Sequence, residues 1–162
     1  MIAVCNTSPI INLAAVGKLE LLKKLYGKIV IPEAVYNEIT IKGKGQPGDR
    51  EVTTSNWIDV IHIKDNILLT SYAAELHPGE AEAIILAMEL NADLLIIDEH
   101  HARSIASKFR IPFIGLLGVL IKAKRRGYIQ EIKPFMDNLI VKAGFWIDRE
   151  LYRYVLETAS EL

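Results

Sequence analysis

Two acidic residues that end an apolar segment are the best candidates for chemistry in this sequence. Asp98 and Glu99 directly follow Leu94–Ile97, a run of four aliphatic residues. Such a run is typical of a central strand in a parallel sheet, buried on both faces. Because ligands of open α/β sheets bind beyond the carboxyl ends of the strands, Asp98 is a candidate site residue. The alternative is that Asp98 and Glu99 cap the helix that follows.

Glu80 is the second candidate, because it falls on the apolar side of the helix predicted from about residue 80 to 90. With a step of about 100° per residue, Glu82 and Glu89 fall together on the opposite side, which we expect to face solvent. A carboxylate that faces the core is costly unless it is paired or bound to a cation. The alternative is a first-turn glutamate that complements the helix dipole.

Glu38 and Asn6 complete a set of oxygen-bearing side chains. Glu38 lies at the border of the apolar face of its predicted helix, where it is either a surface residue or a site residue, and Asn6 follows the first apolar segment. Carboxylate and amide oxygens suit Mg²⁺ or Mn²⁺, ions that lower the pKa of a bound water and stabilise phosphoryl displacement. The sequence contains no Cys–x–x–Cys or His–x–x–x–His pattern that would indicate a zinc site. The histidines are expected at the surface or at helix ends: His62, His77, His100 and His101.

Apolar extended segments alternate with helical patterns along the chain. The extended ones are expected at about 2–5, 28–31, 57–63, 94–97 and 112–115. This alternation predicts a three-layer α/β/α domain with a parallel sheet of about five strands, and residues 1–162 are expected to form a single domain. The apolar pattern is lost from about 42 to 56, which predicts a flexible loop. A helical C-terminal extension is expected from about 129 to 162.

The composition excludes several classes of protein. Hydrophobic residues make up 51% of the chain and charged residues 24%, which excludes intrinsic disorder. Because the net charge is −1, a nucleic-acid site requires local segregation of charge. The single cysteine, Cys5, cannot form an internal disulfide and indicates a reducing compartment. With no signal-peptide pattern and no apolar run long enough for a membrane span, we expect a cytoplasmic protein without a membrane partner.

Four motifs, taken in order, resemble those of PIN domains. They are Val4–Ile11, Ile31–Ile39, Pro78–Ile84 and Leu94–Glu99. The region from Ala102 to Leu120 is similar to one PIN-like subgroup that is often associated with toxin–antitoxin operons. The similarity extends over nearly the whole chain, and the combined order of the motifs is more specific than any single motif.

The resemblance implies a PIN-like fold with an acidic cleft that binds Mg²⁺ or Mn²⁺. Similar proteins of the VapC toxin type cut RNA and leave a 5′-phosphate. Carried over by motif, the catalytic residues are Glu38, Glu80 and Asp98, and the metal ligands are these three acids with Asn6. By the same resemblance, Glu99 adds a fifth ligand. Thr7 or Ser8 is expected to orient the metal ligands or bound waters without contacting the metal.

Asn6 departs from the pattern, because most active PIN nucleases have aspartate at this position. Asparagine is common there in the similar subgroup. The amide oxygen can still bind a hard cation, but it brings no negative charge. A pair of charges about 4 Å apart contributes roughly 4 kcal/mol at an effective dielectric constant near 20. Weakened metal binding, with reduced or absent activity, is therefore an alternative expectation.

The leading hypothesis is a metal-dependent endoribonuclease that acts as the toxin of a toxin–antitoxin pair. A metal-activated water would hydrolyse the RNA phosphodiester. Lysines of the predicted loop, Lys42 and Lys44, are candidates for binding the RNA backbone. Lys122 and Arg125 belong to a further basic cluster, which could instead be a helix C-terminus that complements its dipole.

Two other functions are considered beside the nuclease. The first is a catalytically weak or inactive PIN module that binds RNA or a protein partner. The second is a phospho-acceptor domain with Asp98 as acceptor, which the lack of an acidic pair after the first strand disfavours. A small antitoxin and a homodimer are the expected protein partners of a toxin. The apolar C-terminal residues could form such a contact or close the core: Phe145, Trp146, Leu151, Tyr152, Tyr154 and Val155.

Overall fold

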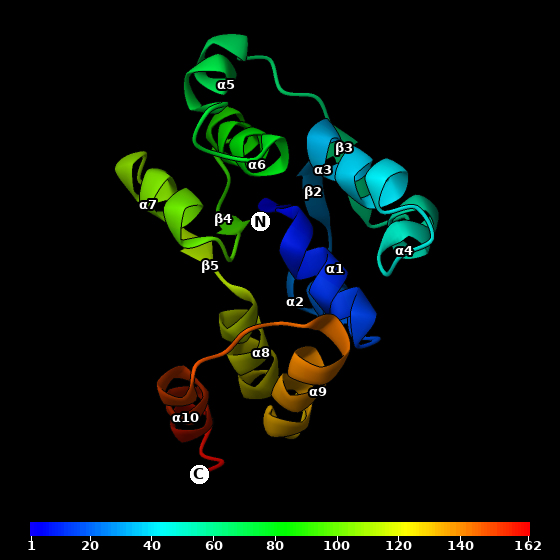
Figure 1. Ribbon diagram of the computed structural model, residues 1–162, viewed down its shortest axis with the longest axis vertical. Helices are drawn as coiled ribbons and strands as arrows, with labels where there is room; N and C mark the ends of the chain where they lie inside the picture. Colours follow the sequence, from blue (N-terminus) through cyan, green and yellow to red (C-terminus); the bar gives the residue numbers. More distant parts are fainter.

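A parallel sheet of five strands forms the centre of the molecule (Figure 1). The computed structural model describes residues 1–162, apart from the side chain of Asn66. The strand order is β3-β2-β1-β4-β5, and every pairing is parallel. The strands are β1 (Ala3–Cys5), β2 (Ile29–Pro32), β3 (Ile58–Ile61), β4 (Leu94–Ile96) and β5 (Phe113–Ile114). The predicted α/β class and parallel five-stranded sheet are confirmed.

Helices cover both faces of this sheet. Side chains alternate across a strand, so Ala3 and Cys5 pack into one buried cluster and Val4 packs into the other. The first cluster involves α1 (Thr7–Ala15), α2 (Glu20–Tyr26), α8 (Leu116–Arg125), α9 (Lys133–Ala143) and α10 (Arg149–Thr158). The second cluster involves α6 (Pro78–Glu89) and α7 (His100–Lys108), with α5 (Asn66–Tyr72) packed against it.

β1 lies in the middle of the sheet, between β2 and β4. Val4 is in register with Val30 on one side and Leu95 on the other. Because β1 and β4 run parallel in adjacent positions, the residues that follow them meet at the same edge. Asn6 follows β1 directly, and its N–H donates to the carbonyl of Ile96 at 3.0 Å. This edge is the one at which the sequence predicts a site.

The segment from 42 to 56, predicted to be a loop, is only partly one. The helix α3 (Glu33–Asn37) continues as a π-helical turn, η1 (Glu38–Lys42), and a separate helix α4 (Asp49–Thr54) follows. Gly48 precedes α4 with φ of 102°, and its N–H donates to the Glu51 carboxylate at 2.9 Å. This cap and the burial of Val52 in the core explain a helix that the lost apolar periodicity conceals.

The C-terminal helices are part of the core. Met136 and Leu139 of α9 are fully buried, as are Val155 and Leu156 of α10. Glu161 links the last residues of the chain to α8 and to the start of α9. Its carboxylate accepts from Lys124 Nζ at 2.9 Å and from the Ile132 N–H at 2.8 Å. Of the C-terminal apolar residues, Val155 closes the core, whereas Trp146 is 80% exposed.

No helix in the described part of the chain combines the length and apolar character needed to cross a membrane.

Candidate active site

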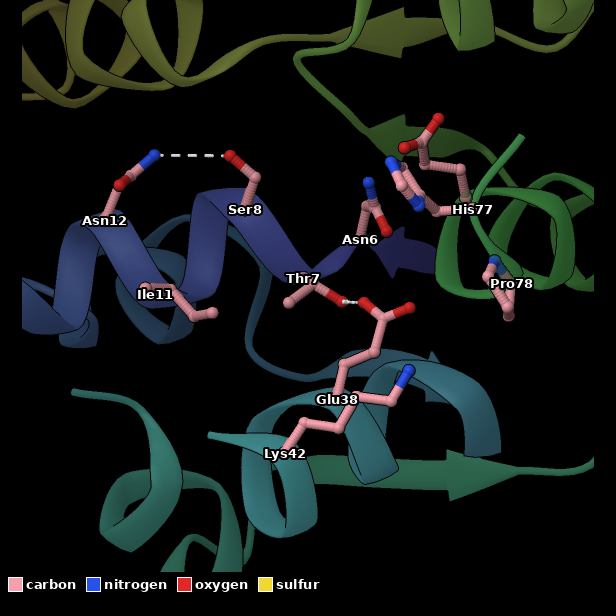
Figure 2. Close-up of a pocket in the computed structure, with 10 residues that line it drawn as sticks. Asn6, Thr7, Ser8, Ile11, Asn12, Glu38, Lys42, His77 and Pro78 are labelled. Carbon is pink, nitrogen blue, oxygen red and sulfur yellow. Dashed lines mark hydrogen bonds between the residues drawn. The ribbon is translucent and has the colours of Figure 1, made fainter. Parts of the chain in front are cut away.

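A cavity of about 420 Å³ lies where α1, η1 and α6 meet, beyond the end of β1 (Figure 2). In chain order, α1 begins directly after β1, η1 follows β2 by way of α3, and α6 begins at the His77–Pro78 corner. The cavity is lined by Asn6, Thr7, Ser8, Ile11, Asn12, Glu38, Lys42, His77, Pro78 and Glu80. Three of the four predicted core positions therefore share one cavity.

Asn6 occupies the inner end of this cavity. It is the N-cap residue of α1 with extended backbone, and only 5% of it is exposed. Its side-chain oxygen, Oδ1, is buried and has no hydrogen-bond partner among the described residues. A buried carbonyl oxygen without a donor is costly, so this oxygen is available to a ligand.

Glu38, the first residue of η1, has both carboxylate oxygens engaged. Thr7 Oγ1 donates to Oε2 at 2.5 Å, and the Gly79 N–H donates to Oε1 at 2.9 Å. Glu38 thus caps the N-terminus of α6, where unpaired N–H groups and the helix dipole attract an anion. A Cβ at Gly79 would lie 2.7 Å from both oxygens, so only glycine permits this approach. The expected orienting role of Thr7 has this contact as its structural basis.

Glu80 faces inward, as the sequence predicts, and is 9% exposed. Desolvation is the main cause that raises its pKa, and the charges of Glu99 and Glu38 raise it further. His77 and His101 lower it, but not enough to reverse the direction. His77 is exposed at the N-cap position of α6, as expected of a surface or helix-end histidine, and it also lines the cavity.

The expectation that Glu82 and Glu89 face solvent is correct for Glu89, which is exposed, and wrong for Glu82, which is half-buried. Glu82 accepts from the Ala34 N–H at 3.2 Å, at the start of α3. Glu89 accepts from the N–H groups of Lys64 and Asp65, both at 2.7 Å. Polar side chains of α6 therefore accept hydrogen bonds from backbone N–H groups of neighbouring segments. The helical periodicity of the sequence cannot distinguish such contacts from exposure to solvent.

Asp98 follows β4 and caps α8 rather than the next helix, α7. Its Oδ1 accepts from the Leu116 N–H at 2.8 Å and lies 3.7 Å from the guanidinium of Arg103. Its Oδ2 is buried and has no hydrogen-bond partner in the described part of the chain. Burial raises the pKa of Asp98, although the Leu116 N–H and then Arg103 lower it. Burial raises the pKa of Cys5, the last residue of β1, and the charge of Asp98 raises it further. Cys5 is in register with Ile96 of β4, so the two strand ends lie side by side.

Arg103 is a residue of the site that sequence reasoning missed. Its Nε donates to the Ile97 carbonyl at 2.8 Å, and its guanidinium lies 5.6 Å from the ring centre of Phe113. Gly115 makes room for it, because a Cβ there would overlap the guanidinium and lie 2.9 Å from Asp98 Oδ1. The signal in the sequence was one arginine on the first turns of the helix that follows Asp98.

The other predicted site residues fall into three groups. Ser8 and Lys42 line the cavity. Glu99 is exposed at the N-cap of α7, and its charge reaches both Glu80 and Asp98. Lys44, Lys122 and Arg125 do not line the cavity, and Lys122 lies 4.8 Å from the ring centre of Tyr26.

The oxygen-bearing side chains at the strand ends fit a divalent cation only in part. Within the described residues, no three His, Cys, Asp or Glu side chains form a ligand group. Two buried oxygens that lack donors do lie at adjacent strand ends, Asn6 Oδ1 and Asp98 Oδ2, and Asn6 shares the cavity with the inward-facing Glu80. Oxygen donors of this kind fit a hard cation such as Mg²⁺ or Mn²⁺. Glu38 fits less well, because both of its oxygens already accept hydrogen bonds.

Comparisons with known proteins agree with this architecture. A family model described as DUF3368, a PIN domain, matches residues 2–161. The chain therefore belongs to this family of PIN domains, which are generally nucleases. Its fold is similar to that of a PilT N-terminus domain protein from the hyperthermophilic archaeon Sulfolobus solfataricus P2. The two have a TM-score of 0.58 and 24% identity, over 76% of this chain and 93% of that one. No curated protein shows significant similarity.

Proposed function

We propose that this PIN domain is a metal-dependent endoribonuclease whose acidic centre consists of Asn6, Glu80 and Asp98, supported by Glu38. One observation carries the proposal. Two buried side-chain oxygens, Asn6 Oδ1 and Asp98 Oδ2, lack donors at adjacent strand ends, and Asn6 lines the cavity. Native structures leave few buried polar atoms unpaired, and a missing ion is one of the reasons for an exception.

Each residue has a distinct task in this proposal. When bound, Mg²⁺ or Mn²⁺ supplies a Lewis acid and an activated water for attack on a phosphodiester. Asn6, Glu80 and Asp98 would hold that cation, with Glu99 adding negative charge from the surface. Thr7 and Gly79 fix the Glu38 carboxylate at the cavity wall. Lys42 lines the same cavity and would hold a substrate phosphate.

The biological setting that we propose is a toxin of a toxin–antitoxin pair acting in the cytoplasm. Its partners would be an RNA substrate, a small antitoxin protein and a second copy of the chain. The exposed apolar residues Val141, Trp146 and Tyr154 lie on or between α9 and α10 and are available for such contacts. This setting is supported by the resemblance of the sequence to toxin-like PIN proteins.

The test is cleavage of single-stranded RNA in the presence of Mn²⁺. Asp98→Asn keeps an oxygen for the Leu116 N–H and removes the charge, so the variant separates the chemistry from the helix cap. We expect a loss of about 10²-fold or more in activity for Asp98→Asn and for Glu80→Gln. If Asn6 Oδ1 and Asp98 Oδ2 bind the cation, Mn²⁺ should raise the thermal stability of the native chain but not that of Asp98→Asn. Cleavage that is unchanged in both variants would contradict this assignment of the centre.

A second candidate is a PIN module with weak or no catalysis that binds RNA or a protein. It is favoured by the low negative charge of the centre, because Asn6 is neutral and Arg103 lies beside Asp98. In this case, calorimetry should detect no Mg²⁺ or Mn²⁺ binding at millimolar concentration, while RNA or partner binding is retained. Asn6→Asp would then be expected to create cation binding that the native chain lacks.

A further inference from the structure

The cavity extends beyond the acidic residues along α1, and its outer part has a different chemistry. From Asn6 to Asn12 the lining follows the first turns of α1, a distance of about 9 Å at 1.5 Å per residue. The outer wall consists of Ser8, Ile11 and Asn12 of α1, and Lys42 of η1 lines the opposite wall, where its side chain runs alongside Glu38 (Figure 2). None of these side chains is acidic. The outer part is therefore not an extension of the cation site.

Asn12 presents half of its amide to this space. Its Nδ2 donates to Ser8 Oγ at 3.2 Å, which uses one N–H and fixes the orientation of the amide. Its Oδ1 and second N–H have no protein partner among the described residues. One free donor beside one free acceptor matches the N7 and N6–H pair of adenine. The same edge of guanine offers two acceptors, so one of them would face Oδ1 and be left without a donor.

The neighbours of Asn12 supply the other contacts that a nucleotide needs. Ile11 is half-buried and offers an apolar surface against which a base can lie. Lys42 is exposed at the end of η1, where its ammonium can approach a backbone phosphate. An unpaired base can enter a cavity of this kind, whereas a base inside a duplex cannot.

We propose that Ser8, Ile11, Asn12 and Lys42 form a nucleotide subsite, in which Asn12 selects adenine next to the scissile phosphate. This inference rests on the proposed ribonuclease function, and it adds a base preference and a named residue that determines it. Lys42 binds the phosphate that flanks the adenine. The whole cavity, at about 420 Å³, falls within the roughly 300–1,000 Å³ of sites that bind small ligands.

A binding measurement tests the subsite without requiring cleavage. The probes are labelled pentauridylates whose central base is uracil, adenine, guanine or cytosine, titrated with the full chain in EDTA and followed by fluorescence anisotropy. We expect the adenine probe to bind roughly tenfold more tightly than the guanine probe. Asn12→Ala should bring the two affinities within about twofold of each other. Asn12→Asp, which has acceptors only, should lose the preference for adenine and favour a central cytosine through its N4 amino group.

Further variants separate recognition of the base by Asn12 from electrostatic binding of the phosphate by Lys42. Lys42→Ala should weaken all probes by a similar factor and reduce the slope of log affinity against log salt by about 0.7. The controls are Asn56→Ala and Lys108→Ala, which alter an exposed asparagine and an exposed lysine outside the cavity. Both controls should leave all affinities unchanged. Thermal unfolding of each variant checks that the fold is intact.

The outcomes distinguish this inference from the proposed function. Equal binding of adenine and guanine probes, or a preference that survives Asn12→Ala, overturns the subsite and leaves the nuclease proposal standing. Adenine selection that depends on Asn12, without any Mn²⁺-dependent cleavage, supports the subsite and overturns the nuclease. Failure to bind any of the probes overturns the subsite and also counts against an RNA substrate.

Discussion

Two carboxylates in this molecule solve the same structural problem with different results. Glu38 caps α6 through the Gly79 N–H, and Asp98 caps α8 through the Leu116 N–H, with Gly115 beside it. In both cases a glycine lets the carboxylate approach the helix. Thr7 donates to the second oxygen of Glu38, whereas the second oxygen of Asp98 lacks a donor and lies buried.

The difference shows which carboxylate is free to bind a ligand. A carboxylate with both oxygens bonded is already satisfied, so Glu38 gains little from a cation. The unpaired Asp98 Oδ2 bears the cost of desolvation, which also raises the pKa of this residue. Helix capping and cation binding are therefore compatible in Asp98, because they use different oxygens. The same comparison suggests that Glu38 mainly shapes the cavity.

The largest expected effect concerns cation-dependent stability. A cation present at 100 times its dissociation constant stabilises the native state by about 2.7 kcal/mol. We expect this gain to disappear in Asp98→Asn and to persist in large part in Glu38→Gln. Thermal unfolding with and without Mn²⁺ measures both. An equal loss in the two variants would show that the carboxylates do not differ in the proposed way.

The two glycines should be next in size. In Gly79→Ala, the added methyl group would lie 2.7 Å from the Glu38 oxygens, and in Gly115→Ala it would displace Arg103. The clashing atoms are mainly the ends of the flexible Glu38 and Arg103 side chains, so each side chain moves away and loses hydrogen bonds, which costs about 1–3 kcal/mol. Denaturant unfolding should reveal the loss in both variants. Neither Gly79 nor Gly115 has a positive φ, so the loss in these variants reports the displaced side chain and not backbone strain.

Glu80→Gln should stabilise the fold while it removes activity. The pKa of Glu80 is raised in the native state, so the native chain holds a proton more tightly than the unfolded chain does. The stability of the native chain therefore falls as pH rises from the unfolded pKa through the raised one. At neutral pH, the neutral glutamine should increase the melting temperature by roughly 2–4 °C. A lower melting temperature for this variant at pH 7 would contradict the expectation that the buried charge of Glu80 destabilises the native state.

Thr7→Val should have the smallest effect. The change removes the hydroxyl that donates to Glu38 Oε2 and preserves the shape of the side chain. A hydrogen bond to a half-buried carboxylate contributes about 0.5–1.5 kcal/mol to stability. Urea unfolding measures this loss, and Thr7→Ser, which keeps the hydroxyl, should restore most of it.

Much of this architecture was accessible from the sequence. The run from Leu94 to Ile97 predicts a doubly buried strand, and α8 lies where its pattern indicates. Glu80 was identified because its position on an apolar helix face is costly without a partner. The helix at 49–54 was missed, since its cap at Gly48 and the buried Val52 give no periodic signal in so short a segment.

The contacts that differ between the two carboxylates could not be predicted. Whether Asp98 caps α7 or α8 depends on tertiary packing, because the Leu116 N–H comes from a helix that begins beyond β5. The role of Arg103 depends on the space above Gly115, and the role of Gly79 depends on the approach of Glu38. Each is a contact between residues distant in the chain, which local propensity does not encode.

The position of β1 at the centre of the sheet also determines when the site can form during synthesis. Ile2 and Asp93, which are joined by a backbone-to-side-chain hydrogen bond at the start of the β1–β4 pair, lie 91 positions apart. At about 5–20 residues per second, the ribosome needs roughly 5–18 s to add the intervening chain. Until then, the Asn6 N–H has no Ile96 carbonyl to bond, and the Asp98 cap must wait longer for α8. A nascent chain therefore leaves the ribosome exit with its acidic residues still apart, and the candidate site can assemble only after most of the chain has been translated.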